Sequence, residues 1–378
     1  MNSILGKIED SIISKVMKSA EENKAINFAE NPIELFTPES VIESAKEAIE
    51  GGFNGYITGA GRKPLRKLTS EMIAKETGVT FDPEEEITIT SGASEAFISS
   101  MLSLVEGENG VVIPEPFYEN YVPITELSRG KPIFLSLADP DYSFHFTDFK
   151  KLPTFKVFIL NSPHNPTGKV FNSEEIKAIG NTVLEREGYL IVDETYKHLL
   201  YGSEYISPLQ IEGLRDRTIV IGSFSTIFSA HGWRLGYVAA KAPIMKEIRK
   251  VHYYSSISAP VPFQWAFENF DMQSNFMENL KTKYKEKRDF LCRALEKAGF
   301  SFYIPDGGYY IFANFEEVWD GNDWGFYKYL LKNKNVVIVP GSAFYSGKNK
   351  GKKKIRFTFS QSDANLKELG SILSAGIT

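Results

Sequence analysis

The sequence predicts an α/β protein whose large domain is built on a mostly parallel sheet and is followed by a smaller α+β domain. Short, continuously apolar runs alternate with helix-like stretches such as Glu95–Val105 and Ser173–Arg186. Apolar runs of this length between helices are typical of parallel strands that are buried on both faces. The runs are Ile87–Thr90, Val111–Pro114, Pro132–Leu137, Val157–Leu160, Tyr189–Val192, Thr218–Ile221 and Leu235–Ala239.

Helices and a second domain are expected around this region. Thr37 and Pro38 are typical of a helix start, with Thr37 as the cap, and an amphipathic helix is expected from Lys63 to about Thr77. The long, charged stretch at 272–298 marks a border, beyond which strands and helices are mixed. The expected elements there are Tyr309–Ala313, Trp324–Lys332, Val336–Val339, Ile355–Phe359 and a terminal helix.

These patterns predict three parts of the chain. An N-terminal arm at 1–35 is expected to join the small domain. The large domain is expected at 36–271 and the small domain at 272–378.

Composition narrows the classes of function. The chain has 378 residues, of which 24% are charged, and its formal net charge is −5. A nucleic-acid surface needs clustered excess lysine and arginine, so no nucleic-acid partner is expected. The single cysteine, Cys292, excludes an internal disulfide and suits a reducing compartment. The N-terminus lacks the apolar core of a signal peptide, and no run reaches the ~18 apolar residues of a membrane span. We therefore expect a soluble, cytoplasmic protein without a membrane partner.

Several predicted strand ends carry small or polar residues, at the place where open α/β sheets bind ligands. The segment Gly92-Ala93-Ser94 leads from a strand into a helix, so it fits either an anion site at free N–H groups or a tight turn capped by Ser94. Asp193 ends a wholly apolar run, and its carboxylate needs either a cationic partner or a role as the cap of a following helix. Tyr118 fits either a ligand cleft or the core.

The order of these pieces is more specific than any one of them. Along the chain come Gly-Ala-x-Glu-Ala, Pro-x-Tyr-x-x-Tyr, Asn-Pro-Thr-Gly, Asp-Glu-x-Tyr, Ser-x-Ser-x and Gly-Trp-Arg-Leu-Gly. In this order and spacing they resemble the motifs of the class I/II aminotransferases, from about Ile26 to the C-terminal helix. The resemblance implies a fold type I enzyme of amino-acid metabolism that uses pyridoxal 5′-phosphate (PLP) or pyridoxamine 5′-phosphate. It also implies a large domain with a mostly parallel seven-stranded sheet.

The resemblance assigns roles around this cofactor and implies no metal. Tyr118 would stack on the pyridine ring, and Asp193 would keep the ring nitrogen protonated. Asn165 and Tyr196 would donate hydrogen bonds to the phenolic oxygen of the ring. The residues that would hold the phosphate are Gly92, Ala93, Ser94, Ser223 and Arg234.

The resemblance also implies the substrates and the assembly. Arg356, in Ile-Arg-Phe-Thr-Phe, matches the arginine that grips the substrate α-carboxylate bidentately, and Asn165 would lie beside it. The substrates would be an α-amino acid and a 2-oxo acid. Tyr56 would reach the phosphate bound to a neighbouring subunit, because these enzymes resemble one another in being homodimers with shared sites.

One position departs from the family in a way that affects the chemistry. Where the family has its Schiff-base lysine after Ser-Phe-Ser, this chain has Thr226. The lysine carries the cofactor and shuttles a proton, and a threonine hydroxyl does neither near neutral pH. Three explanations stay open: replacement by design to trap a ligand complex, a natural lysine-free enzyme, or a non-catalytic ligand-binding homologue.

Other residues bear on these explanations. His231 stands where the family usually has threonine before Gly-Trp-Arg, so it is either a base or a packing residue. Lys169 and Lys197 offer amines, although both are expected to face solvent. The stretch at 26–32, Ile-Asn-Phe-Ala-Glu-Asn-Pro, lacks a glycine of the family and is similar to that of aminocyclopropane-carboxylate synthases. Lyase- or synthase-type chemistry is therefore a further alternative.

Overall fold

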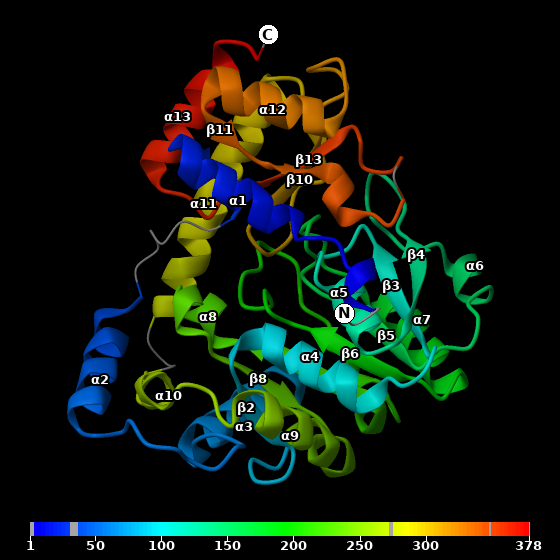
Figure 1. The fold of residues 1–378 in the computed structure, drawn as a ribbon, viewed down its shortest axis with the longest axis vertical. Helices are drawn as coiled ribbons and strands as arrows, with labels where there is room; N and C mark the ends of the chain where they lie inside the picture. The colour runs from blue at the N-terminus through cyan, green and yellow to red at the C-terminus, as the bar shows by residue number, and fades with distance from the viewer. Residues whose placement is uncertain (1–3, 31–36, 272–274, 348, 378) are drawn as a thin grey trace.

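The structure is a computed structural model that describes residues 4–30, 37–271, 275–347 and 349–377. At its centre lies a seven-stranded sheet in the order β2-β8-β7-β6-β5-β3-β4 (Figure 1). All strands of this sheet run parallel except β8, which is antiparallel to β2 and β7. This arrangement confirms the predicted mostly parallel α/β sheet. The strands are β2 (Ile87–Thr90), β3 (Gly110–Glu115), β4 (Lys131–Ser136), β5 (Val157–Asn161), β6 (Tyr189–Asp193), β7 (Thr218–Ser223) and β8 (Gly236–Ala239).

Both faces of the inner strands of the sheet are covered, which is why strands such as β5 are apolar along most of their length and buried throughout. On β5, Val157 and Ile159 belong to a core cluster with residues of α4 (Gly92–Leu104) and α9 (Ala242–Ser256), whereas Phe158 and Leu160 belong to a cluster with α7 (Ser173–Glu185). Because successive side chains point to opposite faces of a strand, each face needs its own cover. The short helices α5 (Tyr121–Leu127) and α6 (Phe146–Phe149) follow β3 and β4.

A third core cluster covers the edge of the sheet formed by β2 and β8. It contains residues of α2 (Glu39–Glu50), α3 (Lys63–Thr77), α8 (Phe224–Ile227) and α10 (Val261–Glu268). The predicted helix from Lys63 to Thr77 is confirmed at both ends. The predicted cap of α2 is wrong, because Pro38 occupies the N-cap without a side-chain hydrogen bond. Thr37 instead donates its hydroxyl to the carbonyl oxygen of Ser229 at 3.5 Å.

The C-terminal part contains a four-stranded antiparallel sheet in the order β12-β13-β10-β9. The run that was expected as one strand, Val336–Val339, forms two strands in two different sheets. Val336 and Val337 pair with β1, whereas Val339 and Pro340 pair with β13, so the chain changes partner at Ile338. The elements are α11 (Phe276–Lys297), β9 (Ser301–Phe302), β10 (Tyr310–Asn314), α12 (Asp323–Lys334), β11 (Val336–Val337), β12 (Val339–Pro340), β13 (Lys354–Thr358) and α13 (Asp363–Ser374).

The N-terminal segment packs on this C-terminal part. It forms α1 (Ile12–Asn23) and β1 (Ile26–Asn27), and β1 runs parallel to β11. Figure 1 shows α1 in blue among the C-terminal elements. Helix α1 contacts strands β11 and β12 there. The division into an arm, a large domain and a small domain stays a prediction, because both expected boundaries touch 31–36 and 272–274, outside the described residues.

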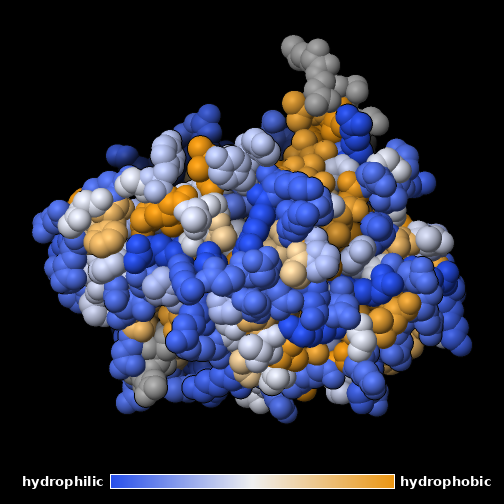
Figure 2. Space-filling model, turned by 90° about the horizontal axis from the view of Figure 1, so that it is seen from below, coloured by the Kyte–Doolittle hydropathy of each residue, from blue (hydrophilic) through white to orange (hydrophobic). Residues whose placement is uncertain are grey.

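Figure 2 shows the face of the molecule that lies at the bottom of Figure 1. This face is mostly hydrophilic, with hydrophobic residues in separate patches. Within the described ranges, no helix is long and apolar enough to cross a membrane.

Candidate active site

A cavity of about 630 Å³ lies at the carboxyl ends of the central strands. Asn161 ends β5, Asp193 ends β6 and Ser223 ends β7, and all three residues line the cavity. Parallel strands bring their carboxyl ends to one edge of the sheet, so these distant residues meet there. Further walls come from α1 and from Tyr309 and Tyr310 at the start of β10.

One corner of the cavity is formed by the first turn of α4 and by Arg234. Gly92 has a φ of +81°, and a Cβ at this position would lie 2.4 Å from Arg234 Nη2, so only glycine lets the guanidinium lie against this backbone. Ala93, Ser94 and Arg234 line the cavity. The first N–H groups of a helix have no intrahelical acceptor, so this corner suits an anion.

Arg234 is held in an unusual conformation. Its φ is +54°, which costs a non-glycine residue about 1–2 kcal/mol. Its Nη1 donates to the carbonyl oxygen of His231 at 3.1 Å. Backbone strain of this kind is common at functional sites, where the surrounding structure holds it in place.

Asp193 presents a carboxylate to the cavity with both oxygens held by donors. The hydroxyl of Tyr121 donates to Oδ2 at 2.7 Å, and the hydroxyl and N–H of Thr195 donate to Oδ1 at 2.6 and 3.1 Å. Burial raises the pKa of Asp193, and the hydrogen bonds lower it in part. A turn rather than a helix follows β6, so the alternative in which Asp193 caps a helix is wrong.

The aromatic wall of the cavity comes from the segment after β3. Tyr118 lines the cavity and contacts the Tyr121 ring edge-on, with ring centroids 5.6 Å apart and an interplanar angle of 87°. Asn120 Nδ2 donates to the Tyr118 hydroxyl at 3.0 Å. Sequence reasoning missed the contact of Tyr121 with Asp193, although Tyr121 is the second tyrosine of the Pro-x-Tyr-x-x-Tyr motif.

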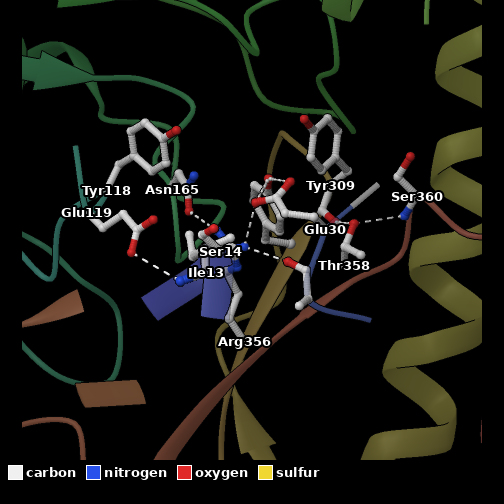
Figure 3. Close-up of polar contacts among 12 residues, drawn as sticks. Ile13, Ser14, Glu30, Tyr118, Glu119, Asn165, Tyr309, Arg356, Thr358 and Ser360 are labelled. Atoms are coloured by element: carbon white, nitrogen blue, oxygen red, sulfur yellow. Dashed lines mark hydrogen bonds and ion pairs between the residues drawn. The ribbon is translucent and has the colours of Figure 1, made fainter. Parts of the chain in front are cut away.

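Arg356 on β13 lies behind the cavity wall. Its side chain is fully buried, and its Nη1 donates to Asn165 Oδ1 at 2.9 Å (Figure 3). Its Nη2 donates to the Ala29 carbonyl oxygen at 2.6 Å and to Glu30 Oε1 at 2.8 Å. Asn165, Glu30 and Tyr310 line the cavity, and the Tyr310 ring centre is 3.9 Å from the guanidinium carbon.

The charge of Arg356 is stabilised within this group. Burial lowers the pKa of Arg356, but Tyr310 and Glu30 raise it more, and the net pKa is above the usual value. Sequence reasoning missed Glu30 as a member of the site. The only signal was the Ala-Glu-Asn stretch that departs from the family.

Thr226 and His231 both line the cavity. Thr226 lies in α8 directly after β7 and is 2% exposed, and His231 opens the short helix η4 (His231–Trp233). Burial lowers the pKa of His231, Glu30 raises it and Arg234 lowers it, with a net decrease. The imidazole is therefore neutral at pH 7 and can accept a proton.

The prediction that Lys169 and Lys197 face solvent is wrong. They are only 7% and 6% exposed. Lys197 Nζ lies 2.8 Å from carboxylate oxygens of both Glu76 and Glu194, and Lys169 Nζ lies 3.6 Å from Glu175 Oε1. A buried ammonium needs such partners. Neither lysine lines the cavity.

Of two further tyrosines that were predicted to contact the cofactor, one lines the cavity and the other does not. Tyr196 lines the cavity and contacts the rings of Tyr309 and Tyr310 edge-on. Tyr56 does not line it and is 85% exposed, so a single chain does not bring Tyr56 to the other residues.

Helix α1 adds a wall that the sequence did not predict. Ile13, Ser14 and Met17 line the cavity. Glu119, next to Tyr118, accepts a hydrogen bond from the Ile13 N–H at 3.3 Å (Figure 3). It also accepts one from the Ser11 hydroxyl at 2.5 Å. A carboxylate at this end of a helix also interacts favourably with the helix dipole.

Comparisons with known proteins cover almost the whole chain. The model of the family described as aminotransferase class I and II matches residues 23–373. Human kynurenine–oxoglutarate transaminase 1 is 29% identical over 93% of this chain and 92% of its own. A probable N-succinyldiaminopimelate aminotransferase of Mycobacterium tuberculosis is 30% identical over 88% of this chain and 86% of its own.

Solved structures agree over the same length. The N-succinyldiaminopimelate aminotransferase structure from Mycobacterium tuberculosis has a TM-score of 0.95 and 28% identity, and the match covers 99% of each chain. An Escherichia coli protein described with a methionine aminotransferase function has a TM-score of 0.94 and 27% identity, again over 99% of each chain.

Proposed function

Because the chain belongs to the class I and II aminotransferases, we propose that its cavity transfers an amino group between an α-amino acid and a 2-oxo acid. The family's members use PLP, and the chain is a PLP-dependent aminotransferase-like enzyme of fold type I. The observation that supports the proposal most is the meeting of an anion corner, the Asp193 carboxylate and the Arg356 group around one cavity.

The described residues offer the non-covalent contacts that PLP or pyridoxamine 5′-phosphate needs. The phosphate needs several donors, and the first turn of α4, Ser223 and Arg234 offer N–H, hydroxyl and guanidinium groups. Gly92 supports this assignment, because any Cβ there would overlap the guanidinium. The ring nitrogen needs an anionic partner, and Asp193 is a carboxylate on the cavity wall.

The amine that binds the cofactor covalently in other members of the family is missing. Thr226 has no amine, and Lys18 is the one lysine on the described cavity wall. Its side chain is 75% exposed, and its Nζ lies 3.7 Å from Glu22. We therefore propose that the cofactor is held without a covalent bond.

The proposed roles follow from the hydrogen bonds of each residue. PLP supplies an aldehyde carbon for the amino group and an electron-withdrawing ring. Asp193 would hold the proton of the ring nitrogen, with Tyr121 and Thr195 fixing its carboxylate. Burial raises the pKa of Tyr196, so its hydroxyl keeps its proton and would donate to the phenolic oxygen of the ring.

Asn165 and Arg356 are proposed to orient the substrate. Asn165 Oδ1 already accepts from Arg356 Nη1, so Nδ2 is the group that remains to donate to the cofactor. Arg356 would bind the α-carboxylate, and Tyr118 would pack on the ring. Proton transfer at the α-carbon is then the step for which the usual residue, a lysine at position 226, is absent.

A second candidate assigns this proton transfer to His231 in a natural lysine-free enzyme. It is favoured by one observation, the position of the His231 imidazole, in its neutral form, on the cavity wall that Thr226 also lines. Lyase- or synthase-type chemistry shares the same cofactor residues, and analysis of the product, a 2-oxo acid against ammonia or a cyclised compound, distinguishes it.

The experiment for the main proposal restores the amine. Thr226→Lys is expected to attach PLP covalently, so that borohydride reduction leaves an adduct on residue 226 in a peptide mass spectrum. The single-turnover rate of amino transfer from an α-amino acid is expected to rise by at least ~10²–10⁴-fold, because a general base returns.

Thr226→Ser is the matched control, since it keeps the hydroxyl and adds no amine, and no adduct is expected. A Thr226→Lys protein that binds PLP without an adduct and gains no rate contradicts the proposal. Loss of residual activity in His231→Ala would then support the lysine-free enzyme.

We also propose that the active unit is a homodimer in which Tyr56 serves the partner's cofactor. Tyr56 is 85% exposed, and the nearby end of α9 exposes Tyr253 at 51% and Tyr254 at 88%. The Tyr56 loop and α9 are adjacent, because a Cβ on Gly59 would lie 3.3 Å from the Tyr253 ring. An exposed aromatic group of this kind is typical of an interface.

A cytoplasmic location is proposed from the cysteine content. Cys292 is free and buried, and burial raises its pKa to about 12. A chain whose one cysteine is a free thiol suits a reducing compartment.

A further inference from the structure

Glu30 is a carboxylate on the cavity wall that none of the roles above uses. Its Oε1 lies 2.8 Å from Arg356 Nη2, and the Tyr310 hydroxyl lies 3.3 Å from each of its carboxylate oxygens. The Glu30 side chain is 23% exposed, whereas that of Arg356 is fully buried. Glu30 lines the cavity and Arg356 does not, so Glu30 is the cavity-facing half of this ion pair. Figure 3 shows the two side chains in contact.

The backbone next to Glu30 is held in place. Arg356 Nη2 donates to the Ala29 carbonyl oxygen at 2.6 Å, and the Ala29 N–H donates to Asn27 Oδ1 at 2.9 Å. Gln361 Nε2 donates to the Asn27 carbonyl oxygen at 2.5 Å. The Glu30 carboxylate can therefore leave Arg356 by rotation of its side chain, but it cannot move far from the cavity.

One of the present partners of Arg356 is a group that a substrate carboxylate can replace. Nη1 is directed to Asn165, and the two hydrogens of Nη2 go to Ala29 and Glu30. Arg356 Nε has no acceptor among the described residues, so the guanidinium is not saturated. Of the groups bound to Arg356, the Glu30 carboxylate is the chemical equivalent of a substrate carboxylate, and it is the one to be replaced.

The cavity offers little to bind a second carboxylate. The acidic residues of the described wall are Glu21, Glu30, Glu119 and Asp193, and the basic ones are Lys18 and Arg234. Arg234 belongs to the anion corner, and Lys18 lies largely in solvent. His231 is neutral because burial lowers its pKa. Among these wall residues, no buried cation remains for the substrate side chain.

We infer that Glu30 makes the site selective for α-amino acids that lack a second carboxylate. The inference rests on the proposed function, in which the α-carboxylate takes the place of Glu30 on Arg356. Glu30 then stays within side-chain reach, and its negative charge lies beside the side chain of the substrate. Neutral and cationic side chains are accepted there, whereas a second carboxylate is repelled by the like charge.

The test compares two unreactive four-carbon ligands, butyrate and succinate, on the PLP-loaded protein. Dissociation constants come from ligand-observed NMR titrations, which require no turnover. Butyrate is expected to bind about tenfold or more tightly than succinate. In Glu30→Gln, which keeps the size and a hydrogen-bond acceptor, this preference is expected to disappear. Glu30→Asp keeps the charge and is expected to keep the preference.

Glu21→Gln is the matched control, because it removes the same charge from an exposed wall residue on α1, and its butyrate preference is expected to be unchanged. Equal binding of both ligands to the original protein, or an unchanged preference in Glu30→Gln, overturns the inference and leaves the carboxylate site standing. Unchanged butyrate binding in Arg356→Leu overturns the proposed role of Arg356 itself, and the inference with it.

Discussion

Single residues around the cavity adopt states that folding alone disfavours. Asp193 has a carboxylate whose pKa is raised by burial, Arg234 has a left-handed backbone, and Arg356 is a fully buried cation. Each state costs free energy of folding, which hydrogen bonds and ion pairs offset in part. Such residues are expected where binding of a charged ligand recovers this cost.

Asp193 leads to a prediction about pH. In the cofactor-free protein its folded pKa lies above that of the unfolded chain, so the folded state binds this proton more tightly. The contribution of Asp193 to stability therefore falls as pH rises through the folded pKa, and it recovers as pH falls toward the unfolded pKa. Asp193→Asn has no such titration. The free energy of unfolding in urea is measured at about pH 7 and at about pH 4.5. Lowering the pH should stabilise the original protein relative to Asp193→Asn.

Asp216→Asn is the control, because Asp216 has a side chain that is 74% exposed. PLP affinity should also decrease in Asp193→Asn and stay unchanged in Asp216→Asn. A constant stability difference across the pH range would contradict the raised pKa.

At the scale of elements, α9 links the anion corner to the Tyr56 loop. His252 on α9 is fully buried, its Nε2 lies 2.7 Å from the Gly59 carbonyl oxygen, and its Nδ1 lies 2.9 Å from Glu95 Oε2 on α4. Glu95 Oε2 also accepts from the Ser91 N–H at 3.2 Å. One imidazole therefore positions both the start of α4 and the loop that carries Tyr56.

His252→Ala should loosen both elements at once. The Gly59 carbonyl and the Glu95 carboxylate would lose a buried partner, which costs about 1–3 kcal/mol of folding stability. Thermal unfolding should show a lower Tm, and equilibrium dialysis should show weaker PLP binding.

Lys250→Ala on the same helix is the matched control, because Lys250 has a side chain that is 58% exposed and pairs only with Glu247 among the described residues. Its stability should change by less than about 0.5 kcal/mol. A Tm of His252→Ala equal to that of Lys250→Ala would rule out the bridging role.

At the scale of the whole molecule, the cavity combines residues from distant parts of one chain, and we propose that it borrows Tyr56 from a second chain. Tyr56→Phe removes the proposed hydroxyl from the partner's site, and Arg234→Ala removes the guanidinium from a chain's own site. A mixed dimer of the two variants then contains one complete site and one that lacks both groups.

Coexpression of differently tagged Tyr56→Phe and Arg234→Ala chains should therefore restore about half of the PLP binding of the original dimer. Each variant alone should bind PLP poorly. PLP per purified mixed dimer can be measured after alkaline release. Mixed dimers that bind no more PLP than either parent would contradict sharing, as would full PLP binding by a protein that sediments only as a monomer.

The fold could be predicted because hydrophobic patterns are local. Continuous apolar runs indicated strands covered on both faces, and the predicted helix from Lys63 to Thr77 matches α3. Strand ends were less predictable, because they depend on pairing. Asn161 and Asp193 extend β5 and β6 by pairing with each other across the two strands, although neither is apolar. Ile338 separates two strands because the residues on either side pair with different sheets.

By itself, the sequence determined the fold class and, through the order of its motifs, the family and the cofactor, and it pointed to some of the polar groups that line the cavity, among them Asp193, Tyr196 and Arg234. Only the tertiary structure decided the partners of those groups. Tyr121 holds Asp193, Glu30 covers Arg356 from a position 326 residues away, and Lys169 and Lys197 are buried in ion pairs. The physical reason is that periodicity and turn chemistry act between near neighbours, whereas a hydrogen bond or ion pair forms wherever packing brings two groups together.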